Sequence, residues 1–228
     1  MSKIVTLLSG GLDSAVLLWW LKSQGNEVTA IAFNYGQRHI RELDHARELF
    51  RISGIADLIV VDMPSVGRNL QGSSQTDMRV DVPEGHYAAD NMKTTIVPNR
   101  NMIMLSIAAG IAMSRGIKAV AFAAHAGDHA IYPDCCGVFK LQFELALNAA
   151  MGCEDFGVAA PFINMPKQAI VTIGAKLGVP FEKTWSCYKG LDLHCGKCGT
   201  CVERREAFAL AGVKDPTIYV DTPEEVLL

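Results

Sequence analysis

Two groups of residues in this 228-residue chain have types and spacings suited to chemistry. The first follows a short apolar run at 4–8 and reads Ser9-Gly-Gly-Leu-Asp-Ser14 before an apolar, helix-like stretch. Glycines let the backbone turn tightly and approach a ligand. The free N–H groups at the start of a helix bind anions, and serine hydroxyls add donors. The segment therefore predicts a phosphate site, with Asp13 able to hold a metal ion.

The second group is four cysteines near the C-terminal end, at Cys187, Cys195, Cys198 and Cys201. Glycines follow two of them, as tight metal-binding turns require. Four thiolates describe a closed, tetrahedral site, so we expect one structural Zn²⁺ per chain. An iron–sulfur cluster and a redox Cys-x-x-Cys pair are the alternatives.

The other three of the seven cysteines are Cys135, Cys136 and Cys153. An odd number argues against a disulfide framework. A free cysteine is usually buried packing. Cys135 ends a polar loop, and its thiolate could relay an acyl group.

The elements that must position these groups follow from hydrophobic periodicity. Apolar runs at 4–8, 27–33, 58–61 and 119–123 predict strands, and a short one lies near 158–160. Helical patterns lie at 40–52, 102–115, 137–151 and 166–177. The polar stretch 64–95 has no period and predicts a long loop.

Strands that alternate with helices indicate a parallel sheet covered on both faces. We therefore expect a doubly wound, mainly parallel, Rossmann-like α/β domain at 1–180. A zinc-binding segment with a C-terminal helix packed on that domain would occupy 181–228. Because ligands of such folds bind beyond the carboxyl ends of the strands, the loops 9–14, 35–39 and 125–134 should share one crevice.

Composition narrows the class of protein. The formal net charge is −3, and half of the residues are apolar. Neither value supports a broad face for nucleic acid or membrane. The longest apolar stretch, 102–113, is too short to span a bilayer, and the N-terminal residues show no signal-peptide pattern. We expect a cytoplasmic protein that acts on small molecules, without a nucleic-acid or membrane partner.

No ordinary phosphate loop, Gly-x-x-x-x-Gly-Lys-Ser/Thr, and no Gly-x-Gly-x-x-Gly occurs in the chain. Residues 9–14 instead match Ser-Gly-Gly-x-Asp-Ser, the signature of the ATP pyrophosphatase (PP-loop) family. Four further segments accompany it, at 34–39, 97–101, 125–135 and 184–188. In this order, and over nearly the whole chain, the set resembles the 7-cyano-7-deazaguanine synthase family.

The resemblance implies an adenine nucleotide alpha-hydrolase type of fold and a homodimer. It implies a ligase that uses ATP with Mg²⁺ and ammonia to turn 7-carboxy-7-deazaguanine into the nitrile used for queuosine, a modified tRNA base. The acid would be adenylated and aminated to an amide, whose oxygen would then be activated and lost.

The chemistry assigns roles to particular residues. We expect ATP to lie at Leu8, Ser9, Gly10, Gly11, Leu12, Asp13, Ser14, Ala15, Val16, Leu17 and Leu18. Catalytic residues would be Asp13, Ser14, Arg100 and Lys167, because metal contacts and cations neutralise phosphate or carboxylate charge. The substrate-binding residues would be Tyr35, Arg38, Asp128, Tyr132 and Asp134. Arg38 would neutralise carboxylate or phosphate charge. Tyr35 and Tyr132 would contact a flat ring, and Asp128 or Asp134 would accept from its N–H edge.

One residue departs from the family pattern, which usually has an arginine after the Asp-Cys pair, where this chain has Cys136. Arginine is the natural partner of a carboxylate. A related ligase that adenylates a different carboxylate therefore stays open as an alternative. A tRNA thiolase would need a cysteine relay and a more basic surface. A non-catalytic nucleotide-binding module would have no need of Asp13.

Overall fold

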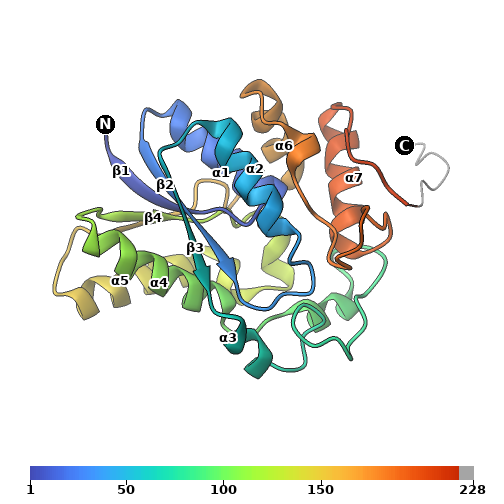
Figure 1. The fold of residues 1–228 in the computed structure, drawn as a ribbon, viewed down its shortest axis with the longest axis horizontal. Coiled ribbons are helices and arrows are strands. Elements are labelled where there is room, and N and C mark those ends of the chain that lie inside the picture. The colour runs from blue at the N-terminus through green and yellow to red at the C-terminus, as the bar shows by residue number, and fades with distance from the viewer. Residues whose placement is uncertain (221–228) are drawn as a thin grey trace.

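Five parallel strands form the centre of the structure, a computed structural model that describes residues 1–220 (Figure 1). The strands are β1 (Lys3–Leu7), β2 (Glu27–Asn34), β3 (Asp57–Asp62), β4 (Ala119–Ala121) and β5 (Gly157–Ala159). Their spatial order is β3-β2-β1-β4-β5. Both faces of the central strand β1 are covered, and its Val5 pairs with Val120 of β4. The predicted doubly wound α/β fold is confirmed.

Helices cover both faces of the sheet (Figure 1). One face carries α1 (Leu12–Ser23), α2 (Glu42–Ser53) and α6 (Lys167–Lys176), and the other carries α4 (Arg100–Ser114) and α5 (Gly137–Met151). Helix α7 (Gly199–Ala211) packs on α6. The short helix α3 (Pro64–Asn69) follows β3. Short 3₁₀ helices are η1 (Asp90–Thr95), η2 (Ala126–Ala130), η3 (Pro133–Cys135) and η4 (Phe181–Lys183).

Two hydrophobic cores hold the layers together. The first lies under α1, α2, α6 and α7 and includes Leu17, Leu49 and Phe208. The second lies under α4 and α5 and includes Ile31, Leu105 and Phe156. Burial of these apolar side chains on both sides is what the nearly continuous apolar strands of the sequence require.

The strand order reverses between β1 and β4, since β2 and β3 lie to one side of β1 and β4 and β5 to the other. In open α/β sheets this reversal leaves a crevice at the carboxyl ends of the strands, where ligands bind. The loops that follow β1 and β4 both begin here. Helix α7 and the 64–95 segment lie beyond this same end of the sheet (Figure 1).

The 64–95 segment is more ordered than its composition predicts, because it contains α3 and η1. It is fastened to the cysteine-rich segment. The N–H of Gly85 donates to the carbonyl of Lys197 at 3.0 Å, and Lys189 forms an ion pair with Glu84. These long-range contacts have no signature in a local sequence window.

One stretch within residues 1–220, Asp90–Ser114, is long and apolar enough to cross a membrane by length and composition. It is longer than the apolar run at 102–113 because it joins η1 to α4. Leu105, Ala108, Ala109 and Ala112 of α4 are fully buried in the second core. Such a single stretch is weak evidence for a membrane span.

Candidate active site

Hydrogen bonds of its own two serines fix the conformation of the phosphate loop between β1 and α1. The Ser14 hydroxyl donates to the carbonyl of Gly11 at 3.0 Å, and it accepts the N–H of Ser9 at 3.2 Å. The N–H of Gly11 donates to the Ser9 hydroxyl at 3.2 Å. Gly11 caps α1 without a side-chain cap, so the first N–H groups of the helix stay available for an anion.

Gly10 is the position in this loop where only glycine fits. Its φ is +92°, and a Cβ there would lie 2.1 Å from the carbonyl oxygen of Glu42 and 2.9 Å from the nitrogen of Ala46, both in α2. The close approach of the loop to α2 therefore depends on the missing side chain.

We expect Gly10→Ala to lower the free energy of unfolding and to weaken Mg·ATP binding. The positive φ alone costs roughly 1–3 kcal/mol, and the backbone clash must also displace α2. Gly25→Ala is the matched control, because its φ is +77° but a Cβ added there would meet nothing within 4 Å. Chemical denaturation and titration calorimetry check this, and equal losses in both variants would contradict it.

A cavity at the carboxyl ends of β1, β2 and β4 brings most of the predicted residues together. Its walls come from the phosphate loop, the end of β2, the start of α4, the loop after β4, the start of α6 and the cysteine-rich segment. The predicted residues on these walls are Leu8, Ser9, Gly11, Leu12, Asp13, Ser14, Tyr35, Arg100, Asp128, Tyr132 and Lys167.

The other predicted site residues lie elsewhere. Ala15, Val16, Leu17 and Leu18 are fully buried in the first core, because these positions of α1 pack on the sheet and its neighbouring helices. Gly10 is turned toward α2. The Arg38 guanidinium donates to the carbonyls of Ser74, Asp77 and Val80 and braces the 64–95 segment. The Asp134 carboxylate accepts the N–H of Asn101 at 3.0 Å.

The charged centre of the cavity is Lys167, at the first position of α6. Its ammonium lies 3.0 Å from Asp13 Oδ2 and 2.8 Å from Glu203 Oε2. Burial alone would lower the pKa of Lys167, but the two carboxylates outweigh it and raise that pKa above its usual value. The same contact, together with His125, holds the pKa of Asp13 below its usual value despite burial. Lys167 is thus a fixed cation beside the phosphate loop.

His125 and Asp128 form a second polar unit beside Lys167. His125 Nδ1 accepts the N–H of Gly127 at 3.1 Å, which assigns the proton of the neutral ring to Nε2. Asp128 accepts the N–H of His125 at 3.1 Å and the hydroxyl of Tyr87 at 3.1 Å. With both oxygens engaged, Asp128 is positioned by η2 and by the 64–95 segment.

Another part of the cavity wall combines one arginine with several tyrosines. Arg100 begins α4 and lines the cavity with Tyr35, Tyr132 and Tyr188. Burial raises the pKa of Tyr35 to about 12, against the opposing effect of the Arg100 guanidinium. No carboxylate within residues 1–220 forms an ion pair with Arg100. This guanidinium is therefore suited to a ligand carboxylate, and the tyrosine rings to a flat heterocycle.

The four clustered cysteines fit a tetrahedral metal ion. Their sulfur atoms are buried and lie within 4.8 Å of one another. Zn–S bonds of about 2.3 Å place the sulfurs of such a site about 3.8 Å apart, and Cys195 and Cys201 are separated by 4.0 Å. The N–H groups of Lys197 and Cys198 point at the sulfur of Cys195, which would offset thiolate charge.

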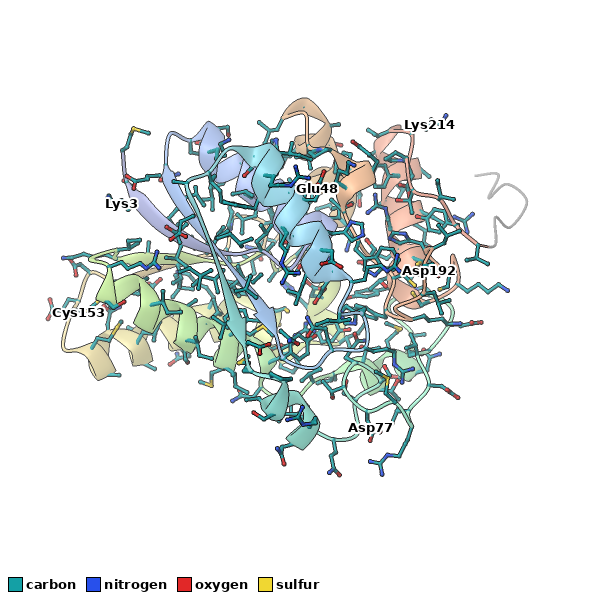
Figure 2. All side chains as sticks on the ribbon, in the orientation of Figure 1. Lys3, Glu48, Asp77, Cys153, Asp192 and Lys214 are labelled. Carbon is teal, nitrogen blue, oxygen red and sulfur yellow. The ribbon has the colours of Figure 1, made fainter. Side chains whose placement is uncertain are left out.

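The cysteine cluster lies at the same end of the molecule as the cavity. In Figure 2 Asp192 of this segment and Asp77 of the 64–95 segment lie toward one end, and Lys3 and Cys153 lie toward the other. Trp185, Ser186, Tyr188 and Thr200, which flank the cysteines, line the cavity. The metal-binding segment is therefore a wall of the site.

Cys135 lines the cavity, whereas Cys136 does not. Burial raises the pKa of the Cys135 thiol above its usual range, so this thiol is a poor nucleophile. Asn101 donates to its sulfur at 3.2 Å. Cys136 caps α5 outside the lining, and Arg100 is the arginine that the lining contains within residues 1–220.

Sequence reasoning missed several residues of the cavity. Glu203 belongs to a stretch of mixed charge that looks like solvated surface, although its spacing of two residues from Cys201 places it near the metal-binding segment. Tyr87 and Glu42 carry no local signal, since the first lies in a polar loop and the second at the start of an amphipathic helix. Tyr188 lies in one of the segments that carry the family resemblance, but nothing in the sequence marks its ring as cavity-lining.

Comparison with known proteins gives consistent matches. A family model described as "Queuosine biosynthesis protein QueC" matches residues 3–212. A 7-cyano-7-deazaguanine synthase of Brucella anthropi is 50% identical over 220 residues, which cover 96% of this chain and 94% of that protein. The synthase of Ruegeria pomeroyi is 52% identical over 221 residues, covering 96% and 95%.

Among solved structures, an NMN synthetase from Francisella tularensis has a TM-score of 0.50 at 16% identity, over 92% of this chain and 77% of that one. At this identity the likeness concerns the fold alone. The sequence match to the Brucella anthropi synthase extends over almost the full length of both proteins. The family match spans residues 3–212, a range that contains the phosphate loop and the four cysteines. This chain belongs to the QueC family of queuosine biosynthesis proteins.

Proposed function

We propose that this chain is an ATP-dependent ligase that converts 7-carboxy-7-deazaguanine and ammonia to 7-cyano-7-deazaguanine. The observation that carries the proposal is identity of about half over 96% of the chain to proteins named for that product. The cavity adds chemical support. It is lined by a phosphate loop, by a buried lysine and by Arg100, which several tyrosines accompany and which has no ion-pair partner within residues 1–220.

The reaction needs two activations at one carbon. The carboxylate attacks the α-phosphorus of ATP, which releases pyrophosphate and leaves an acyl adenylate. Ammonia then adds to the carbonyl carbon, and AMP leaves with the acid's oxygen to give the primary amide. The amide oxygen then attacks the α-phosphorus of a second ATP and releases a second pyrophosphate, and loss of AMP and protons leaves the nitrile. Both rounds activate an oxygen on the same carbon, so one site serves both.

The residues have matching roles in this proposal. The start of α1 and Ser14 hold the phosphates, and Lys167 offsets the charge that develops on the leaving pyrophosphate. Asp13 would contact Mg²⁺, which neutralises phosphate charge when bound. Arg100 would hold the carboxylate of the acid, while Tyr35 and Tyr132 contact its ring.

Incubation of the protein with the acid, ammonium and Mg·ATP tests this function. We expect the nitrile by mass spectrometry, with AMP and pyrophosphate as nucleotide products. Pyrophosphate release with a different carboxylic acid, but none with this one, would identify a related ligase. ATP binding without turnover of any acid would identify a binding module.

We propose that the metal is Zn²⁺, one per chain, and that it holds the segment beginning near residue 181. The boundary at about residue 180 stays a prediction, and the last eight residues of the predicted segment lie outside the described residues. We expect Cys198→Ser to lose zinc and to destabilise α7, because Cys198 caps this helix. Elemental analysis and amide hydrogen exchange check this. Cys153→Ser, at a cysteine outside the cluster, should keep the metal.

We also propose a homodimer, as the resemblance to the synthase family implies, and a cytoplasmic location, as the sequence pattern predicts. The chain has a mass of 24.7 kDa. Sedimentation equilibrium should therefore give twice this value at micromolar concentration. A mass equal to one chain at every concentration would contradict the dimer.

A further inference from the structure

Helix α7 carries an acidic side chain from the cysteine-rich segment into the charged centre of the cavity. Glu203 lies two residues after Cys201, and its side chain is only 11% exposed. Its Oε2 accepts from Lys167 Nζ at 2.8 Å, the shorter of the two carboxylate contacts of that ammonium. Its Oε1 lies 3.8 Å from Nε2 of His125.

The fold does not need this carboxylate to place α7. Cys198 and Cys201 anchor the first turn through the metal cluster. Arg204, with no exposed surface, donates to the Thr184 hydroxyl and the Phe181 carbonyl and pairs with Asp215. A buried carboxylate is costly unless it is paired. The contact of Glu203 with Lys167 therefore points to a role in the site.

Asp13 shows what that role is. Its Oδ2 contacts Lys167, while its buried Oδ1 has no hydrogen-bond partner within residues 1–220. In the proposed function Asp13 contacts the Mg²⁺ that accompanies ATP. A carboxylate that binds a divalent cation holds a neighbouring ammonium less strongly, since the two cations repel each other and share its charge. Lys167 then needs a second anchor.

We propose that Glu203 is a positioning residue, which holds the Lys167 ammonium at the phosphate loop while the Asp13 carboxylate contacts Mg²⁺. Lys167 acts on the substrate, and Glu203 acts through Lys167. The four cysteines thereby contribute to the reaction indirectly, because they fix the first turn of α7, the helix that carries Glu203. This inference rests on the proposed function only for the identity of the step that it assists.

The test compares Glu203→Gln with Glu206→Gln, which removes a partly exposed carboxylate from the same helix. Without the charge of Glu203, Asp13 is the carboxylate that still forms an ion pair with Lys167. The charge of Asp13 is then less available to Mg²⁺. We expect Glu203→Gln to lower kcat for pyrophosphate release about 10- to 100-fold. The Mg²⁺ concentration for half-maximal rate at saturating ATP should rise about tenfold, and KM for the acid should stay within about twofold of the wild-type value. Glu206→Gln should match the wild type in all three.

Zinc content and melting temperature are measured on each variant, so that a structural effect is recognised. If Glu203→Gln loses zinc or melts below the assay temperature, Glu203→Asp replaces it in the test, because its side chain is one methylene shorter and withdraws the carboxylate from the Lys167 ammonium. A raised Mg²⁺ requirement in a variant that keeps its zinc and its fold supports positioning. A Mg²⁺ requirement equal to that of the wild type in such a variant overturns it.

Failure of the proposed function gives a different result. If the wild type releases no pyrophosphate with the acid, the assigned reaction is wrong. Calorimetric binding of Mg²⁺ and ATP to wild type and Glu203→Gln then still decides the positioning role, because equal Mg²⁺ dependence of ATP binding would refute it.

Discussion

Replacing Lys167 by methionine is expected to lower kcat for pyrophosphate release by about 10²–10³-fold, the usual effect of removing one preorganised group that stabilises transition-state charge. Its ammonium is fixed by Asp13 and Glu203 at 3.0 and 2.8 Å beside the phosphate loop. Methionine keeps most of the side-chain volume but supplies no charge. Single-turnover release of pyrophosphate at saturating Mg·ATP measures the step directly.

The same substitution should also destabilise the fold, because it leaves two carboxylates facing each other in the cavity. Loss of one partner of a fully buried pair costs about 3–5 kcal/mol. Asp13 is partly exposed to the cavity, so we expect about 1–3 kcal/mol here. The activity assay must therefore run well below the melting temperature. Lys176→Met is the matched control, since Lys176 lies exposed at the other end of α6. Pyrophosphate release by Lys167→Met at the wild-type rate would remove Lys167 from the mechanism.

The general position of the site was predictable because it follows from topology. The apolar runs of the sequence predicted the strands β1, β2 and β4, and polar loops follow each of them. Parallel strands bring such loops to one edge of the sheet. Asp13, Tyr35, Asp128 and Tyr132 all line the resulting cavity. Local patterns were sufficient for these residues, since each lies in the segment that directly follows a strand.

The residues that were missed or misplaced depend on contacts across the chain. Glu203 reaches Lys167 over 36 positions, and Tyr87 reaches Asp128 over 41. Arg38, expected at the substrate, is instead occupied by backbone carbonyls at 74, 77 and 80. The residues at 15–18 follow the loop directly, which suggests contact with ATP, yet all four are buried in the first core, because α1 is packed against the sheet and the neighbouring helices. Such long-range contacts cannot be read from any short stretch of the sequence.

Replacing Arg100 by methionine is expected to lower kcat/KM for the acid by about 10- to 150-fold, which corresponds to the roughly 1.5–3 kcal/mol of a hydrogen bond to a charged group. Arg100 lines the cavity with three tyrosines and forms no ion pair within residues 1–220. A carboxylate ligand would supply the missing counter-charge, and Mg·ATP should bind as in the wild type. Arg100→Lys should recover only part of the loss, because an ammonium lacks the planar fork of guanidinium.

Two comparisons make this prediction specific. Arg115→Met removes an exposed arginine from the other end of α4 and should leave kcat/KM unchanged, since Arg115 pairs with Asp57 away from the cavity. The primary amide, supplied as substrate for the second activation, carries no negative charge. Arg100→Met should therefore impair turnover of the amide much less than turnover of the acid. Equal losses for acid and amide would show that Arg100 acts on the phosphates. Because Cys136 stands where the family pattern usually has an arginine, a residue other than these two would then have to bind the carboxylate.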